Sequence, residues 1–263
     1  MKQFILDREP DSDNIVRLEG NDYHYLVRVR RLAAGEAFNA FLPDGSETSI
    51  KILSISKNIL TGECQITPPC FTSSSPHRNI ILFQSLPKSD KMDLIVRQAA
   101  ESGIKEIVPF VSEFSVVPAG KTGAGISEQK FLRWERIIKE ARQQSGSKTA
   151  TGICKPLTIN QLLDYWVGLI EKDKTIGLLF HHRGLENEGL HSYLYNVTSG
   201  NVVIAIGPEG GFSDTEVTLF LQNGFKPVMI GDTILRAETA ALYCAAAVRI
   251  LLLESNQWEL KQK

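Results

Sequence analysis

From residue 79 onward the chain repeats one pattern, in which a short continuous apolar run is followed by a stretch with helical periodicity. Asn79 to Leu86 is such a run, and Ile104 to Val111 is the next. Apolar side chains at successive positions indicate strands that are covered on both faces. Such strands, alternating with helices, predict an α/β fold built on a parallel sheet.

The stretches between these runs carry helix signals. After the first strand, Met92, Ile95, Val96 and Ala99 fall at i, i+3, i+4 and i+7, and Gly103 stands where a left-handed residue ends a helix. The other predicted elements are a helix over 130–144, strands over 175–181, 201–206 and 227–230, and a last helix over 238–254. The last helix is apolar nearly all round, so we expect it to be buried in the core or against a partner subunit.

The first 71 residues follow another pattern, with short apolar runs broken by turn residues such as Pro43-Asp44-Gly45. This pattern predicts a small β-barrel or sandwich. Residues 67–78 concentrate Pro and Ser and are typical of a linker. We therefore predict two domains, residues 1–71 and residues 72–263.

Composition excludes several classes of protein. With 43% hydrophobic residues the chain can build a sizeable core, which excludes bulk disorder. The longest apolar stretch, Ala240 to Leu253, contains Arg249 and is shorter than the ~20 residues of a membrane span. We expect no membrane segment, no secretory leader and a cytoplasmic location. The four cysteines show no C-x-x-C spacing, so we expect no metal site.

Positive charge is concentrated in the middle of the chain. The net charge is −1, but residues 73–150 hold 12 basic and 8 acidic side chains. Near the N-terminus, Arg28, Arg30 and Arg31 lie together. On a strand, Arg28 and Arg30 would share a face and could bind phosphate oxygens, although charges that protect an edge strand would look the same.

A glycine-rich loop joins the strand ending at Ile206 to a helix. The loop reads Gly-Pro-Glu-Gly-Gly-Phe, and Ser213 with Glu216 forms a capping box that opens the helix. Neither the dinucleotide fingerprint nor the phosphate loop is present. Because ligands bind at the carboxyl ends of strands in open α/β sheets, this loop is a candidate ligand site, unless it is only a tight turn.

A second loop, residues 230–240, again joins a strand to a helix and carries Arg236 and Glu238. Together the two loops can enclose one pocket, with a third wall from Leu179, Phe180 and His181. His181 and His182 would alternate across a strand end, so we expect that they do not both line it.

The two loops, with other passages, carry a family resemblance. The motifs GPEGGFS and IGDTILRAETA, the N-terminal HYLVRVRRL, the central PKSDKMD and the segment from Trp134 to Gly146 together resemble the RsmE family. These proteins are 16S ribosomal RNA uracil-N3 methyltransferases of the SPOUT superfamily. The resemblance implies a PUA-like β-barrel that binds RNA, a SPOUT methyltransferase domain with a trefoil knot, S-adenosylmethionine as cofactor, and a homodimer.

The resemblance also implies site residues. The expected cofactor-binding residues are Leu179, Phe180, His181, Ile206, Gly207, Gly211, Met229, Ile230, Gly231, Ile234, Leu235 and Ala237. The expected RNA-binding residues are Arg28, Arg30, Arg31, Lys88, Lys91, Arg142 and Lys148. Two positions depart from the family pattern, because Phe114 and Ser147 stand where the family usually has arginine.

Methylation of uracil N3 requires loss of the imide proton while the ring oxygens take up charge. We expect Arg236 to stabilise that charge, unless it forms an interface salt bridge with Glu209 or Glu238. Those two glutamates are the candidate proton acceptors. Three alternatives stay open: another SPOUT enzyme acting on tRNA or a ribose 2′-hydroxyl, a non-catalytic RNA-binding ribosome assembly protein, and a less favoured nucleotide-dependent oxidoreductase.

Overall fold

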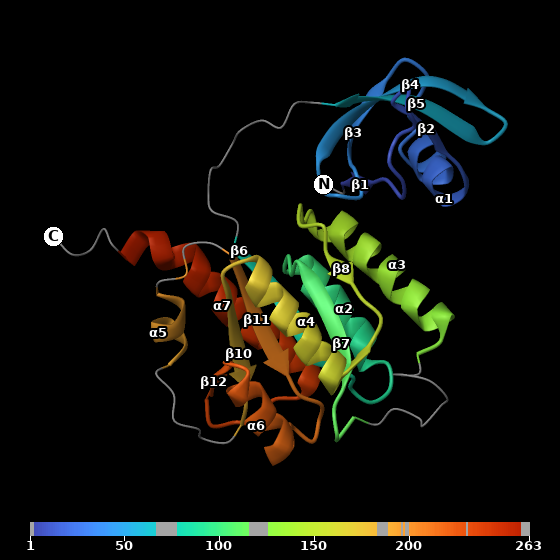
Figure 1. The fold of residues 1–263 in the computed structure, drawn as a ribbon. Helices are drawn as coiled ribbons and strands as arrows, with labels where there is room; N and C mark the ends of the chain where they lie inside the picture. Colours follow the sequence, from blue (N-terminus) through green and yellow to red (C-terminus); the bar gives the residue numbers. More distant parts are fainter. Residues whose placement is uncertain are drawn as a thin grey trace. The chain divides into compact units, whose positions relative to one another are not determined.

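The computed structural model describes residues 3–66, 78–115, 126–182, 189–195, 197, 200–229 and 231–258. The chain divides into two compact units, shown in Figure 1. The first unit contains Met1–Ser74 and Arg142–Ala150, and the second contains Ser75–Ala141 and Thr151–Lys263. The stretch Arg142–Ala150 thus clusters with the first unit, although it lies within the range of the second predicted domain.

The first unit is built on one curled five-stranded sheet (Figure 1). Its strands are β1 (Phe4–Ile5), β2 (Ile15–Leu18), β3 (Ala37–Phe41), β4 (Glu47–Ser56) and β5 (Ile59–Ile66). They lie in the order β1-β3-β4-β5-β2, and every pair is antiparallel except β1 with β3. The predicted turn between β3 and β4 is confirmed, because Gly45 has a φ of +92° and its N–H donates to Leu42 O at 3.0 Å.

One predicted strand of this unit is wrong. The segment around Arg28, considered above as a strand, is helical and continues α1 (Gly20–Tyr23) as the π-helical segment η1 (His24–Val29). Tyr23 and Leu26 are buried three positions apart, so packing of a helical face overrides local β propensity. The shared strand face proposed for Arg28 and Arg30 therefore does not exist.

The second unit is a parallel sheet with helices on both faces. Its strands are β6 (Arg78–Ser85), β7 (Glu106–Val111), β8 (Gly152–Ile153), β9 (Leu157–Thr158), β10 (Thr175–Phe180), β11 (Gly200–Ile206) and β12 (Lys226–Val228). They are ordered β12-β10-β11-β6-β7-β8, with β9 beside β7, and all pairs are parallel. The predicted α/β fold is confirmed, whereas the trefoil knot stays a prediction.

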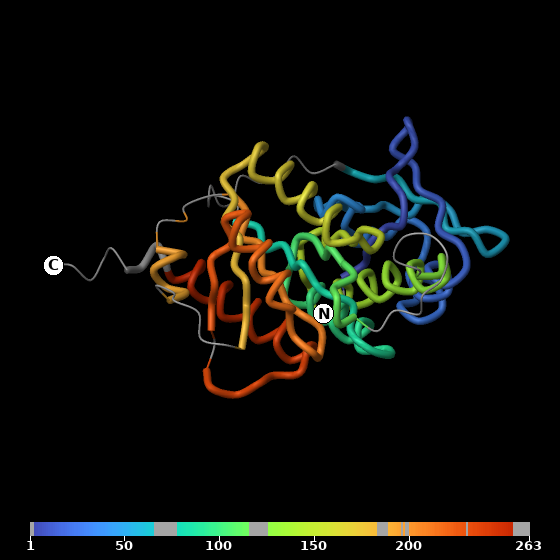
Figure 2. Tube along the Cα trace, turned by 60° about the horizontal axis from the view of Figure 1, so that its bottom comes forward, coloured from blue at the N-terminus to red at the C-terminus, as the bar shows by residue number. Residues whose placement is uncertain are grey.

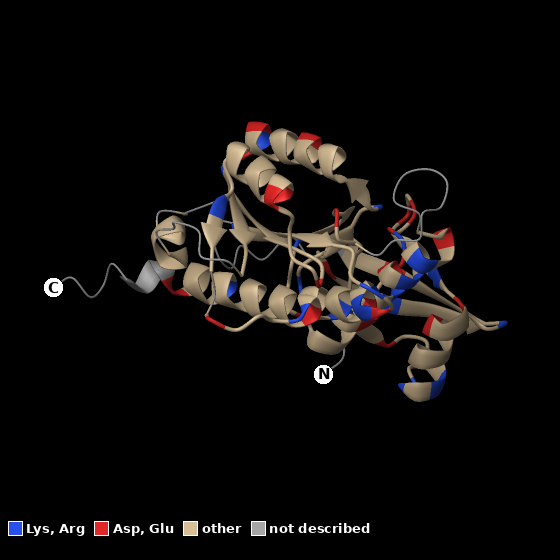
Figure 3. Ribbon diagram, turned by 90° about the horizontal axis from the view of Figure 1, so that it is seen from below, with Lys and Arg blue, Asp and Glu red and all other residues tan. Residues whose placement is uncertain are grey.

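Two apolar cores form because successive side chains of a strand face opposite ways. In β6, Ile80 and Leu82 enter one core, and Ile81 and Phe83 enter the other. Figure 3 shows helices on either side of the sheet. The first core includes residues of α2 (Lys91–Glu101), α3 (Glu128–Ser145), α5 (Leu190–Leu194) and α7 (Ala237–Trp258), and the second includes residues of α4 (Ile159–Lys172) and α6 (Asp214–Gln222).

The helix signals have mixed outcomes. The capping box of Ser213 with Glu216 and the positive φ of Gly103 are confirmed. Helix α4 was missed, although Thr158 and Gln161 form a second capping box that the sequence displays as T-x-x-Q.

Helix α7 is buried along one side only. Cys244 and Val248 lie in the core, whereas Tyr243, Ile250 and Leu253 are exposed. The prediction that this helix is buried is therefore confirmed for one side, which packs into the core of this chain. Within the described ranges, no helix has both the length and the apolar character that crossing a bilayer requires.

Close packing of the second core gives a test of the fold. A Cβ added at Gly177 in β10 would lie 2.7 Å from Cδ1 of the buried Phe225. We expect Gly177→Ala to lower the free energy of unfolding in urea by about 1–3 kcal/mol. Gly168→Ala in α4 is the matched control, because nothing lies within 4 Å of its added Cβ. It should raise the free energy of unfolding, since alanine favours a helix over glycine by about 1 kcal/mol. Equal effects of the two substitutions would contradict this packing.

Candidate active site

A pocket of about 260 Å³ lies at the carboxyl edge of the second unit's sheet. Its walls come from the ends of β10 and β11, the loops that follow β11 and β12, and the first turns of α7. Figure 2 follows the chain out of β12 and into α7. Because parallel strands end at the same edge, three segments that are distant in sequence meet there.

The glycine-rich loop after β11 is tightly folded. Gly211 has a φ of +74°, and its N–H donates to Pro208 O at 2.9 Å. A Cβ added at Gly207 would lie 3.2 Å from the carbonyl carbon of Gly211, and one added at Gly211 would lie 3.2 Å from His182 Cε1. The loop therefore needs glycine at these positions.

The pocket contains eight of the twelve expected cofactor-binding residues. These are Phe180, His181, Ile206, Gly207, Gly211, Ile234, Leu235 and Ala237. Leu179, Met229 and Gly231 do not line it, and Ile230 lies outside the described residues.

Strand alternation explains where Leu179 points. Phe180 belongs to the core on the α7 side, so the preceding Leu179 enters the opposite core against α4 and α6. The same reasoning applies after β12, where Val228 lines the pocket and the next residue, Met229, is 42% exposed. The predicted period of two, applied strictly, would have excluded Leu179.

His182 also lines the pocket, so the expectation that the two histidines diverge is wrong. Strand β10 ends at Phe180, and the alternation therefore no longer holds at 181 and 182. Their ring centroids lie 4.7 Å apart. Across the residues that the structure describes, no three His, Cys, Asp or Glu side chains gather as a metal site would require.

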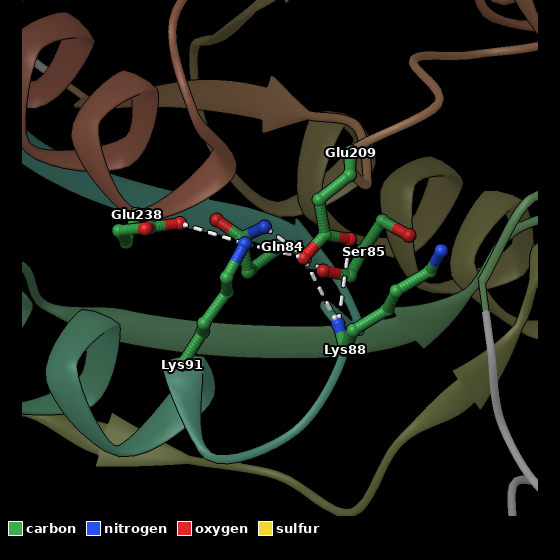
Figure 4. A network of polar contacts seen from close by, with 6 residues as sticks. All are labelled: Gln84, Ser85, Lys88, Lys91, Glu209 and Glu238. Atoms are coloured by element: carbon green, nitrogen blue, oxygen red, sulfur yellow. Dashed lines mark hydrogen bonds and ion pairs between the residues drawn. The ribbon is translucent and has the colours of Figure 1, made fainter.

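A cluster of three charges joins three elements beside the pocket (Figure 4). Lys91 Nζ at the start of α2 lies 2.8 Å from Glu209 Oε1 of the glycine-rich loop and 3.5 Å from Glu238 Oε2 of α7. The backbone N–H of Lys88 donates to both carboxylate oxygens of Glu209, at 3.2 and 3.3 Å. Lys91 was expected to bind RNA, but its ion pairs with the two glutamates were not predicted, because α2 precedes the loops by more than 100 residues.

The cluster shifts the pKa values of its members. Burial opposes ionisation of Glu209, but the hydrogen bonds from Lys91 and from backbone N–H groups outweigh it, and the pKa of Glu209 is lowered. The hydrogen bond to Glu209 raises the pKa of Lys91. Glu209 is therefore held as a carboxylate and is a weak proton acceptor.

Arg236, the expected charge-stabilising residue, is exposed and stands between the pocket residues Leu235 and Ala237. Its two predicted salt-bridge partners, Glu209 and Glu238, are both bound by Lys91. Arg236 is thus an exposed residue between two pocket-lining residues, and its suggested partners are bound by Lys91.

The expected RNA-binding residues differ in exposure. Arg28, Arg30, Arg31 and Lys88 are exposed, and Lys148 is paired with Glu47. Arg142 is 5% exposed, and burial lowers the pKa of its guanidinium. A direct contact of Arg142 with RNA needs an exposed side chain, so the structure argues against that assignment.

Comparison with known proteins finds RNA methyltransferases. A family model described as an RNA methyltransferase domain matches residues 73–249, and one described as an RNA methyltransferase PUA domain matches residues 18–63. Ribosomal RNA small subunit methyltransferase E 2 of Borreliella burgdorferi is 31% identical, over 97% of this chain and 100% of its own. The Aquifex aeolicus ribosomal RNA small subunit methyltransferase E is 31% identical, over 87% of this chain and 90% of its own.

A solved structure has the same fold over nearly the full length. It is the Neisseria gonorrhoeae ribosomal RNA small subunit methyltransferase E bound to S-adenosyl methionine, with a TM-score of 0.74 and 26% identity, covering 95% of this chain and 98% of the other.

Removing the Lys91 ammonium should loosen the glycine-rich loop. We expect Lys91→Met to speed amide hydrogen exchange at residues 207–211, because Glu209 then keeps only its backbone donors. Lys88→Met is the matched control, since Lys88 bonds Glu209 through its backbone. The pKa of Glu209 is lowered, so the Lys91 contribution should persist as the pH falls to the usual glutamate range near ~4.3 and disappear only below it. Identical exchange in the two variants would refute this role.

Proposed function

Since the chain belongs to the ribosomal RNA small subunit methyltransferase E family, we propose that it transfers a methyl group from S-adenosylmethionine to N3 of a uridine in 16S ribosomal RNA. The observation that carries the proposal is one pocket enclosed by three chain segments at one sheet edge, with charged groups beside it.

The residues of the pocket fit this cofactor. Phe180, Ile206 and Leu235 offer apolar surface to an adenine ring, and the glycine-rich loop offers backbone donors and acceptors. Lys91, Glu209 and Glu238 together carry a net charge of −1, which favours a cationic ligand nearby. When bound, S-adenosylmethionine supplies a methyl group on a positively charged sulfonium.

Arg236 stabilises the charge that develops on a uracil oxygen in the proposed reaction. Its guanidinium stays protonated, and it is exposed at the start of α7, where it can reach a ligand outside the chain. Fixed donors directed at developing charge are the largest single contribution in many enzymes.

Glu238 is the proposed acceptor of the N3 proton. Glu209 is less suitable, because its hydrogen bonds lower its pKa. Glu238 Oε2 is buried and forms an ion pair with Lys91 Nζ at 3.5 Å, and it makes no closer hydrogen bond to the part of the chain that the structure describes. One carboxylate thus fixes the loop, and the other keeps an oxygen for a proton.

Small ribosomal subunits from cells that lack the protein test this function. We expect the purified protein to restore N3-methyluridine to their 16S RNA, measured by mass spectrometry of nucleosides.

Arg236→Ala should lower kcat by about 10²–10³-fold. Glu238→Gln should also lower kcat, because an amide cannot accept the proton. Arg97→Ala, exposed on α2, is the control and should leave the rate within a few-fold of wild type.

The outcomes separate the alternatives. Methylation of a ribose or of tRNA would indicate another SPOUT activity. Calorimetry without heat of binding to S-adenosylmethionine would indicate a non-catalytic RNA-binding protein. The proposed ribosomal substrate also implies a cytoplasmic location.

We also propose a homodimer that covers the exposed side of α7. Leu242, Tyr243, Ile250 and Leu253 are 37–66% exposed and recur at helical spacing on that side. A contiguous apolar surface of this kind is typical of an interface between subunits. We expect sedimentation to show a dimer for the wild type and a monomer for Ile250→Asp, whereas Val167→Asp on α4, 41% exposed, should remain dimeric. A monomeric wild type would disprove the assignment.

A further inference from the structure

A second hollow of about 480 Å³ adjoins the pocket. It is lined by Lys88, Glu113, Phe114, Ser115 and Gly210. Gly210 lines both cavities, so the two meet at the glycine-rich loop. A molecule in the second hollow would therefore lie next to one bound in the first.

The turn that carries Phe114 is braced from three directions. Within the turn, Ser112 N–H donates to Ser115 Oγ at 3.0 Å, and Ser115 Oγ lies 2.8 Å from Ser85 Oγ of β6. Glu113 N–H donates to Glu216 Oε1 at 2.9 Å, which fixes the turn to the first turn of α6. The backbone around Phe114 is thus held in place before any ligand binds.

Phe114 is only partly covered by the rest of the chain, since 46% of the residue is exposed. Gly210 lets it approach the loop, because a Cβ there would lie 3.1 Å from Phe114 Cβ. An exposed aromatic ring on a rigid turn, with the exposed Lys88 on the same hollow, combines a stacking surface with a cation. RNA-binding sites use the same pair, with the ring for a base and the cation for its phosphate.

Building on the proposed function, we infer that the second hollow binds the target nucleotide of the RNA, with its unstacked uracil lying on Phe114. Lys88 contacts a neighbouring phosphate, and the shared wall at Gly210 brings the base to the methyl donor. Phe114 stands where the resembling family usually has arginine, and a guanidinium plane can also stack on a base. Phenylalanine in place of arginine therefore still allows a base to stack, but it offers an apolar surface in place of a charged one.

Substitutions at Phe114 test the stacking directly, with methylation-deficient small ribosomal subunits as the substrate. We expect Phe114→Ala to raise KM for the subunits by roughly 5- to 150-fold, the equivalent of one lost base stack, with kcat within about 3-fold of wild type. Phe114→Trp should keep a KM near that of wild type, because its ring also stacks. Phe114→Leu should behave as Phe114→Ala, because it is apolar but not aromatic.

The controls separate this inference from the proposed function. The affinity for S-adenosylmethionine, measured by calorimetry, should be equal in all Phe114 variants, and Val167→Ala on α4 should leave KM unchanged. Lys88→Gln should reduce the slope of the logarithm of RNA affinity against the logarithm of salt concentration by about one. The substitution keeps the backbone hydrogen bond from residue 88 to Glu209. An inactive wild type would overturn the proposed function. If the wild type is active, a wild-type KM in either Phe114→Ala or Phe114→Leu would overturn the stacking.

Discussion

Burial of both faces of the central strands is the constraint on which the rest of the structure depends. Strand β11 lies between β10 and β6, and its side chains enter the two cores alternately. Because both faces of these strands are covered by helices, the connecting loops leave only at the strand ends. The strands are parallel, so the loops after β10, β11 and β12 emerge at the same edge of the sheet. The pocket exists because these loops meet there, and the alternating side chains decide that Phe180 lines it whereas Leu179 does not.

Electrostatics then fixes the loops relative to one another. Lys91 comes from the first helix of the second unit and binds carboxylates from two later segments. Because Glu209 is also held by the backbone of Lys88, the glycine-rich loop is attached to α2 by the Lys91 side chain and to the segment before α2 by the main chain (Figure 4). Such a fixed arrangement favours catalysis, since its charges need no reorganisation when a substrate binds. The same loop lies between the pocket at the sheet edge and the hollow beside Phe114.

The sequence predicted the second unit better than the first. Continuous apolar runs predicted both ends of β6, β7, β10 and β11 to within two residues, because burial on both faces leaves a strong local signal in the sequence. The segment containing Arg28 is helical although Tyr and Val favour strands, because Tyr23 and Leu26 pack in the core from one face of the helix. Helix α4 was missed although its capping box is visible in the sequence.

By itself the sequence determined the fold class and the glycine-rich loop, because periodicity, capping and backbone conformation act between near neighbours. The family resemblance added eight residues that line the pocket. The tertiary structure alone decided that Lys91 binds the two glutamates, that Arg142 is buried, that both histidines face the pocket and that Phe114 borders it. These features depend on contacts between segments far apart in the chain. Their distances are set by the packing of the sheet and its helices, for which a linear pattern carries no direct signal.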